Sequence, residues 1–382
     1  MKASFRLVTI AGIEIGIHYT WLLAFALITW TLAEGFFPDA FPGWSTATYW
    51  VTGVIAALLL FLSVLVHELA HSLVARSRGL PVQGITLFIF GGVSSLGAEA
   101  RSAWEEFAIA VVGPATSLLL AAAFGVGYWA TAHQDSPPTA ILAYLALINA
   151  MLGLFNLLPG FPLDGGRVLR AAIWGATGSF YRATRIAAGV GQGLAFLFIG
   201  WGVFQVLTGN VLGGLWIAFI GWFLNSAAEA SRQETVVQET LRGVRVSEVM
   251  ERNPEVISPG FAVDVLVRDF FLQRGKRALP VHEDGQLVGI VSITDVKGVA
   301  PDKWASTRVA QVMTTTPLWS VSPDSDVAEA LRLLAERGLN QLLVVAGGAA
   351  VGVVSRENIL RYVQLMSDLG VSRRPGALGR RG

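Results

Sequence analysis

Long apolar segments dominate the first 230 residues of this 382-residue chain, and the remainder is mixed and charged. A helix needs about 20 mostly apolar residues to cross the hydrocarbon core of a membrane. Over the whole chain only 14% of residues are charged, against about 25% in a typical soluble domain. The pattern predicts a polytopic α-helical membrane protein with six spans, at Tyr19–Leu32, Trp50–Ala75, Phe107–Ala130, Thr139–Leu158, Ile186–Leu207 and Val211–Ala228.

The placement of lysine and arginine predicts the orientation of these spans. If the N-terminus is cytoplasmic, the three far-side connections, 34–49, 131–138 and 208–210, contain neither Lys nor Arg. This is the positive-inside pattern, and it predicts a multi-pass protein of the cell membrane with both ends in the cytoplasm. We expect the first span to be retained as an anchor, because no small-residue cleavage site follows it. The net charge of +1 says nothing about nucleic acid, and no basic run in the sequence suggests a nucleic-acid partner.

An internal repeat follows the apolar half. Arg245-Val-Ser-Glu-Val-Met250 recurs as Arg308-Val-Ala-Gln-Val-Met313, and Gly289-Ile-Val-Ser292 recurs as Gly352-Val-Val-Ser355. Each copy is predicted to be a β-α-β-β-α unit, and so small a unit is expected to pack against its twin. The predicted domains are a membrane domain at 1–230, a linker at 231–244, repeat copies at 245–300 and 308–365, and a disordered tail at 366–382.

His67-Glu68-Leu-Ala-His71 lies near the end of the second predicted span. Ionisable groups are costly in lipid, so their presence there is typical of a functional site. On a helix the two histidines share one face and can hold one cation. The chain has no cysteine, so a metal must be held by nitrogen and oxygen atoms. The pattern predicts a zinc hydrolase with Glu68 as the general base.

The predicted third ligand is Asp164, which lies in Asn156-Leu-Leu-Pro159-Gly-Phe-Pro162-Leu-Asp164-Gly-Gly. Prolines and glycines around it predict a locally unwound segment, and the topology brings it to the depth of His71. Asn156 could stabilise an oxyanion or make an interhelical hydrogen bond, and both readings stay open. Asn149 is expected to serve in packing, and His18 to be a polar anchor before the first span.

Residues 82–96, VQGITLFIFGGVSSL, are too short and too glycine-broken to cross the membrane. A membrane-associated β-hairpin or re-entrant loop is expected, because irregular backbone at membrane depth persists only against protein or a water-filled cavity. A loop lying on the membrane surface is the alternative.

Together these motifs resemble the site-2 protease family of intramembrane zinc metalloproteases. The resemblance also includes Gly91-Gly92-Val93 and the stretch from Glu106-Phe107 to Gly113-Pro114. It implies one zinc ion on His67, His71 and Asp164, with Glu68 catalytic. It also implies cleavage of single-span membrane proteins in or beside their transmembrane helix, often after a first cut by another protease. The hairpin at Gly91, Gly92 and Val93 would bind the substrate strand by β-addition.

The repeat resembles a tandem pair of CBS domains, a module similar to adenine-nucleotide sensors. The resemblance implies a site for ATP, ADP or AMP at Ser292, Thr294 and Asp295, with the carboxylate on the ribose hydroxyls. The second copy has Asn358 in place of the acid. The alternative role of the pair is packing or homodimerisation.

Two other functions use the same residues. A metal transporter gated by the CBS pair would employ His67, His71 and Asp164 as its transport site, but it gains nothing from a glutamate beside the first histidine. A pseudoprotease would bind membrane partners without cutting them, although all the catalytic residue types are present.

Overall fold

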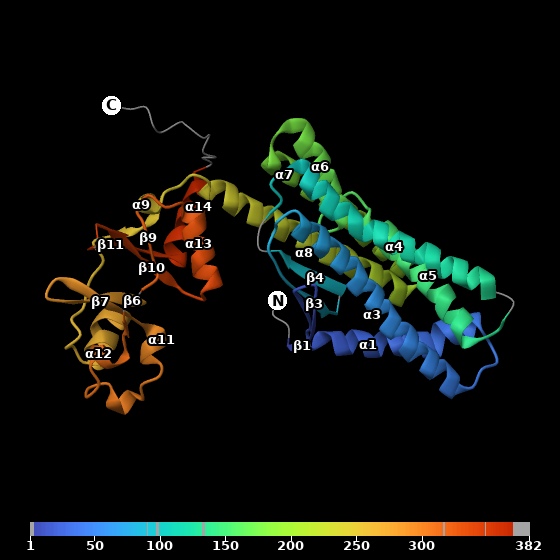
Figure 1. Ribbon diagram of the computed structural model, residues 1–382, viewed down its shortest axis with the longest axis horizontal. Coiled ribbons are helices and arrows are strands. Elements are labelled where there is room, and N and C mark those ends of the chain that lie inside the picture. Colours follow the sequence, from blue (N-terminus) through green and yellow to red (C-terminus); the bar gives the residue numbers. More distant parts are fainter. Residues whose placement is uncertain are drawn as a thin grey trace. The chain divides into compact units, whose positions relative to one another are not determined.

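The computed structural model describes residues 4–89, 91–96, 99–131, 134–315, 318–347 and 349–369 (Figure 1). The chain divides into two compact units, Met1–Thr235 and Val236–Gly382. The first is mainly helical and the second is a mixed α/β unit, as the sequence predicts.

The first unit contains, in the described residues, six helical segments long and apolar enough to cross a membrane, which confirms the predicted number. The first, Thr20–Ala40, is longer than expected because a π-helical turn and a short helix continue α1. The helical elements of this unit are α1 (Thr20–Thr31), η1 (Leu32–Phe36), α2 (Phe37–Ala40), α3 (Thr46–Ser77), α4 (Ala103–Thr131), α5 (Pro137–Asn156), α6 (Asp164–Thr177), α7 (Phe180–Leu207) and α8 (Val211–Leu241).

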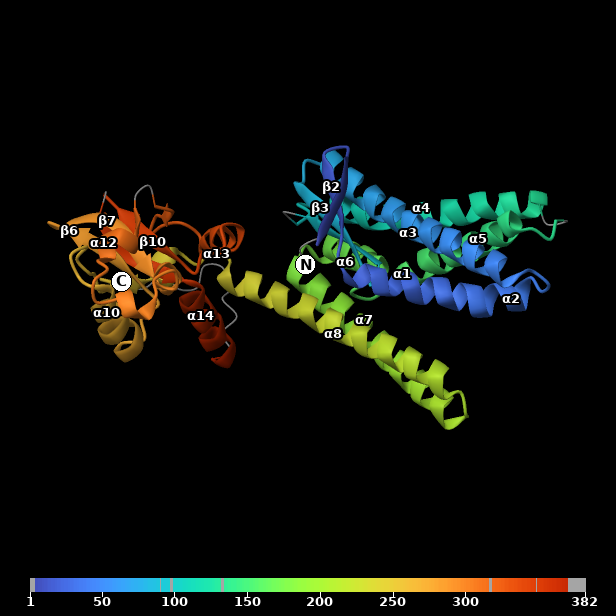
Figure 2. The same ribbon diagram turned by 90° about the horizontal axis from the view of Figure 1, so that it is seen from below.

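Small residues bring these helices close together. A Cβ on Gly153 of α5 would lie 3.1 Å from the carbonyl oxygen of Pro114 in α4. A Cβ on Gly202 of α7 would lie 2.5 Å from the backbone nitrogen of Ala218 in α8, and these two helices run antiparallel side by side (Figure 2). Between lipid-embedded helices such close contacts supply the packing energy that burial from water supplies elsewhere.

The first unit also contains a four-stranded sheet in the order β1-β2-β3-β4. Its strands are β1 (Phe5–Ile10), β2 (Ile13–Ile17), β3 (Val82–Phe88) and β4 (Gly91–Leu96). The β3–β4 pair is the hairpin expected from the sequence. Unexpectedly, β2 pairs with β3 in parallel, so an N-terminal hairpin extends the same sheet. The Oγ atoms of Ser72 and Ser94 lie 2.9 Å apart and join α3 to β4.

The helix α8 continues through most of the stretch expected to be a linker. Residues 229–241 contain no glycine or proline, so nothing in them stops the helix. Gly243, with φ of +69°, follows its end in the left-handed region that favours glycine. The boundary between the units falls inside the helix, at Thr235.

The second unit contains the two repeat copies, and each contributes a strand to the other's sheet. β5 of the first copy pairs with β11 of the second, and β8 of the second pairs with β7 of the first. The copies therefore complete each other, as expected for units too small to fold alone. The elements are α9 (Val246–Val249), β5 (Glu251–Arg252), α10 (Val263–Val265), η2 (Leu266–Gln273), β6 (Ala278–Glu283), β7 (Gln286–Ser292), α11 (Ile293–Val296), η3 (Pro301–Lys303), α12 (Val309–Val312), β8 (Thr314–Thr315), β9 (Ser320–Val321), α13 (Val327–Glu336), β10 (Gln341–Ala346), β11 (Ala349–Ser355) and α14 (Arg356–Asp368).

Candidate metal centre

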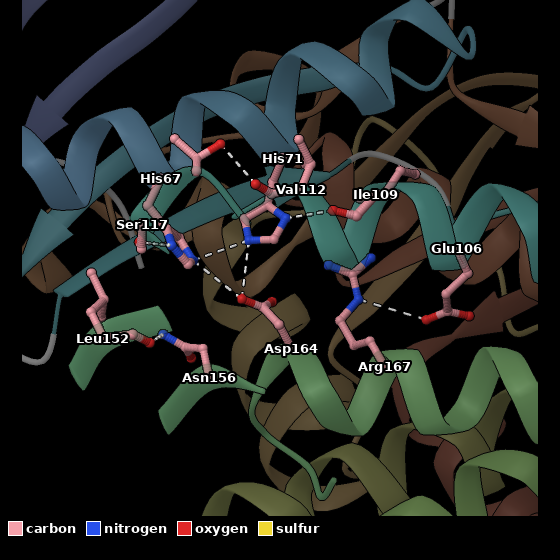
Figure 3. Close-up of polar contacts among 11 residues, drawn as sticks. His67, His71, Glu106, Ile109, Val112, Ser117, Leu152, Asn156, Asp164 and Arg167 are labelled. Atoms are coloured by element: carbon pink, nitrogen blue, oxygen red, sulfur yellow. Dashed lines mark hydrogen bonds and ion pairs between the residues drawn. The ribbon is translucent and has the colours of Figure 1, made fainter. Parts of the chain in front are cut away.

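His67 and His71 lie one turn apart on α3, and Asp164 is the first residue of α6 (Figure 3). The two Nε2 atoms are 3.2 Å apart, and Asp164 Oδ2 lies 3.2 Å from one and 3.1 Å from the other. A tetrahedral zinc ion with bonds of about 2.0–2.1 Å holds its ligand atoms roughly 3.3 Å apart. The three donor atoms are therefore spaced as zinc requires.

The outer ring nitrogens of the histidines fix which atoms face the centre. His71 Nδ1 lies 2.6 Å from the carbonyl oxygen of Ile109, so this nitrogen must carry the hydrogen. His67 Nδ1 lies 2.8 Å from the hydroxyl of Ser117. In a neutral His71 ring, Nε2 then presents a lone pair toward another nitrogen and a carboxylate oxygen. A cation placed among these atoms satisfies all three, and outer hydrogen bonds of this kind are usual for metal-binding histidines.

Asp164 presents an ionised carboxylate to the same centre. Burial of the side chain raises its pKa, but the hydrogen bonds and charges of His67 and His71 outweigh burial and hold the pKa well below its usual range. Its place at the start of α6 also favours negative charge, because the helix dipole is positive there.

The backbone of α4 closes one side of the cluster at Gly113. A Cβ on this residue would overlap Nε2 of His71 and would lie 2.7 Å from Nε2 of His67. The sequence singles out Gly113-Pro114 only through the family resemblance, and the structure gives a steric reason for the glycine. It also adds two contacts that sequence reasoning missed, Ser117 and the carbonyl of Ile109. Ser117 had a signal, as a polar residue in an apolar span, whereas a backbone carbonyl has none.

Glu68 lies between the histidines in sequence and beside β4 in space. A Cβ on Gly92 would come 2.5 Å from Cγ of Glu68. Its neighbour Gly91 has φ of +124°, a conformation that favours glycine, and Val93 is exposed. Of the hairpin residues singled out in the sequence, Gly92 therefore lies next to the predicted general base, and Gly91 and Val93 flank it on the same strand.

The other polar residues singled out in the sequence, Asn156, Asn149 and His18, each have a hydrogen-bond partner within the protein. Asn156 Nδ2 donates to the carbonyl of Leu152 in its own helix, 3.0 Å away (Figure 3). Asn149 Nδ2 reaches Ser63 Oγ of α3 at 3.2 Å, which is a packing contact between helices. The ring of His18 lies 2.9 Å from Thr20 Oγ1, at the start of α1.

In the second unit, Asp295 Oδ2 accepts hydrogen bonds from the backbone nitrogen and the hydroxyl of Ser292, both at 2.7 Å. The acid thus caps α11, and Thr294 beside it is exposed. Asn358 accepts the same two bonds from Ser355 in the other copy. The local cap is preserved where the negative charge is not, which explains how the two copies can differ here without a change of fold.

Both halves of this chain are similar in sequence to known proteins. Peptidase family M50 matches residues 55–134 and 128–200, and the CBS domain matches residues 246–301 and 309–365. Rip3 of Mycobacterium tuberculosis, named as a zinc metalloprotease, is 37% identical over 96% of this chain and 94% of its own length. Zinc metalloprotease MJ0392 of Methanocaldococcus jannaschii is 30% identical over 96% of this chain and 98% of its own length.

Solved structures resemble each half separately. The site-2 protease from Methanocaldococcus jannaschii is 29% identical, with a TM-score of 0.41, and the match covers 60% of this chain and 94% of that one. CBSX2 in complex with AMP is 26% identical, with a TM-score of 0.30, over 33% of this chain and 99% of that one. From the two long relatives and the matching domains, the chain belongs to peptidase family M50 and is a multi-pass membrane zinc metalloprotease with a pair of CBS domains.

Proposed function

We propose that this enzyme is an intramembrane endopeptidase of the site-2 protease type, which hydrolyses peptide bonds within or near the transmembrane segments of single-span membrane proteins. The observation that carries the proposal is the cluster of His67, His71 and Asp164. Its three donor atoms lie within 4.8 Å of one another, and two of them belong to a candidate membrane span. A hydrolytic centre at this position acts on bonds that soluble proteases do not reach.

In the proposed reaction, His67, His71 and Asp164 would hold one zinc ion. When bound there, zinc would lower the pKa of a coordinated water to about 7 and polarise the scissile carbonyl. Glu68 takes the proton from the attacking water and passes it to the leaving amine. Asn156 is a candidate for stabilising the oxyanion. In that role its Nδ2 would give up the hydrogen bond to the Leu152 carbonyl and donate to the substrate oxygen instead.

The substrate is proposed to bind as an added strand along β4. This strand ends the sheet order β1-β2-β3-β4, and no further strand pairs with it among the described residues. An unpaired edge can hydrogen-bond an extended peptide through its main chain. Gly91, Gly92 and Val93 lie on this strand and Gly92 approaches Glu68, so a peptide bound there would be close to the general base.

The predicted orientation in the membrane places the reaction near the cytoplasmic side. The lysine and arginine distribution supports a cell-membrane protein with both ends in the cytoplasm. His71 then lies toward the cytoplasmic end of its span, from where water can reach the centre. Cleavage in this setting, following a first cut by another protease, would be regulated intramembrane proteolysis.

The CBS pair is proposed to bind an adenine nucleotide at Ser292, Thr294 and Asp295 and to regulate the protease, with homodimerisation through the same domains. CBSX2 has been solved with AMP, which supports this class of ligand. ATP, ADP and AMP share the adenine and ribose that the site would recognise.

The proposal is tested with Glu68→Gln in the full-length protein, co-expressed with a single-span membrane protein. Cleavage should be lost while the purified variant retains one zinc ion, since Glu68 is not a ligand. Glu34→Gln is the matched control, because Glu34 lies in the first span, accepts a hydrogen bond from Trp50 of α3, and can be replaced in that bond by glutamine. Undiminished cleavage by Glu68→Gln would refute the mechanism. Zinc uptake into proteoliposomes that depends on His67, without any new substrate terminus, would favour a transporter.

A further inference from the structure

One face of α4 contacts both histidines of the candidate metal centre and the helix that begins with Asp164. Glu106, Ile109, Gly113 and Ser117 follow one another at spacings of three and four residues, which places them along a single side of the helix. The Ile109 carbonyl and the Ser117 hydroxyl hold the outer nitrogens of the two histidines, and Gly113 leaves room for the inner ones. Glu106 is the one member of this face that contacts α6 and not the histidines.

Glu106 joins α4 to the helix that begins with Asp164. Its side chain is fully buried, and Arg170 of α6 donates to Oε1 through both Nε and Nη2. Arg167 approaches the same oxygen, with its Nε 3.6 Å away (Figure 3). A buried carboxylate that loses its cationic partners is strongly destabilised, so these contacts resist separation of the two helices.

Arg170 also holds the loop that leads into α6. Its guanidinium lies 4.9 Å from the ring centre of Phe161, in the segment just before Asp164, and 4.5 Å from that of Phe180. Such cation–π contacts add to the ion pair in a desolvated setting. The same loop is packed against the start of α6, where a Cβ on Gly165 or Gly166 would overlap its backbone. Arg170 therefore fixes both the helix and the chain entering it.

We propose that Glu106 and Arg170 are positioning residues that set the placement of Asp164 relative to the two histidines. Ile109 and Ser117 orient the rings of His71 and His67. The Glu106–Arg170 pair holds α6 against α4, and this fixes the position of Asp164 because Asp164 is the first residue of α6. All three ligands then take their geometry from one face of α4. The proposal rests on the proposed zinc site but not on proteolysis, because its consequence is a change in metal binding.

The test measures zinc affinity of the full-length protein in detergent, by competition with a chromophoric chelator. Glu106→Gln and Arg170→Lys should each bind zinc about 10- to 100-fold more weakly, the range usual for loss of contacts that orient metal ligands. Cobalt-substituted protein should show an altered d–d spectrum, which reports on coordination geometry. Glu105→Gln is the matched control, because Glu105 accepts from the backbone nitrogen of Arg101 and takes no part in the pair.

A double variant, Glu106→Gln with Arg170→Met, separates positioning from stability. Glu106→Gln alone leaves the charge of Arg170 buried without its partner, and the double variant removes that charge as well. The metal-free double variant should therefore unfold at a higher temperature than Glu106→Gln, while its zinc affinity stays low. If Glu106→Gln does not fold, Arg170→Lys and the double variant carry the test. Wild-type zinc affinity and an unchanged cobalt spectrum in all folded variants would overturn the proposal. Weak zinc binding by the wild-type protein itself would instead count against the proposed function.

Discussion

Replacing Gly113 by alanine should weaken zinc binding without unfolding the protein. The added methyl carbon would overlap Nε2 of His71 and lie 2.7 Å from Nε2 of His67, which is the space among the three donor atoms. The helix cannot easily withdraw, because the next residue, Pro114, is in close contact with Gly153 of α5. Over-packing of this kind costs about 1–3 kcal/mol. If that cost falls on the metal-bound state alone, zinc binding weakens by roughly 5- to 150-fold.

The effect on the metal-free protein should be smaller. Alanine is favoured over glycine inside a helix by about 0.8–1.0 kcal/mol, which offsets part of the overlap. Without a metal, the histidine rings can turn aside at the cost of their hydrogen bonds to Ile109 and Ser117. Gly125→Ala in the same helix is the matched control, because its Cβ would meet only Ala146 at an ordinary 4.0 Å. Zinc affinity and the thermal unfolding of metal-free protein are measured for both. Equal zinc affinity of Gly113→Ala and Gly125→Ala would refute this account of the site.

Three further substitutions probe the neighbourhood of the centre and the nucleotide site. Gly92→Ala should lower the catalytic rate and leave zinc content unchanged, since its Cβ would displace Glu68, 2.5 Å away; loss of zinc would contradict that assignment. Ser117→Ala should weaken zinc binding about 10- to 100-fold by freeing His67 Nδ1, as chelator competition would detect. Asp295→Asn should retain the α11 cap and thermal stability but abolish an AMP-induced rise in Tm; a full rise would exclude a ribose contact by the acid.

Local patterns were enough to predict the spans and the cluster. A run of apolar residues is a property of one segment, and His67 and His71 share a helix face by spacing alone. Asp164 could be added because the topology limits which residues reach that depth. The two repeat copies were visible for the same reason, since each carries its own turns and apolar strands.

Long-range and backbone features were not predictable in this way. The parallel pairing of β2 with β3 joins residues about 70 positions apart, and the exposed residues of β1 form no periodic pattern that marks a strand. The extension of α8 past Ala228 was missed because a change from apolar to charged composition was taken for the end of a helix. Composition reports the surroundings of a helix, whereas only glycine, proline or a cap reports its end.

The contacts that orient the metal ligands are also long-range or backbone contacts, which local sequence patterns do not reveal. Glu106 was visible as a charged residue at the start of an apolar span, but its partners on α6 are more than 60 residues away in sequence. The Ile109 carbonyl could not be read from any side chain. A metal centre is therefore recognisable from its ligands, while its rigidity comes from a neighbouring helix whose role depends on packing. Variants on that face of α4 are the ones for which sequence reasoning and structural reasoning predict different results.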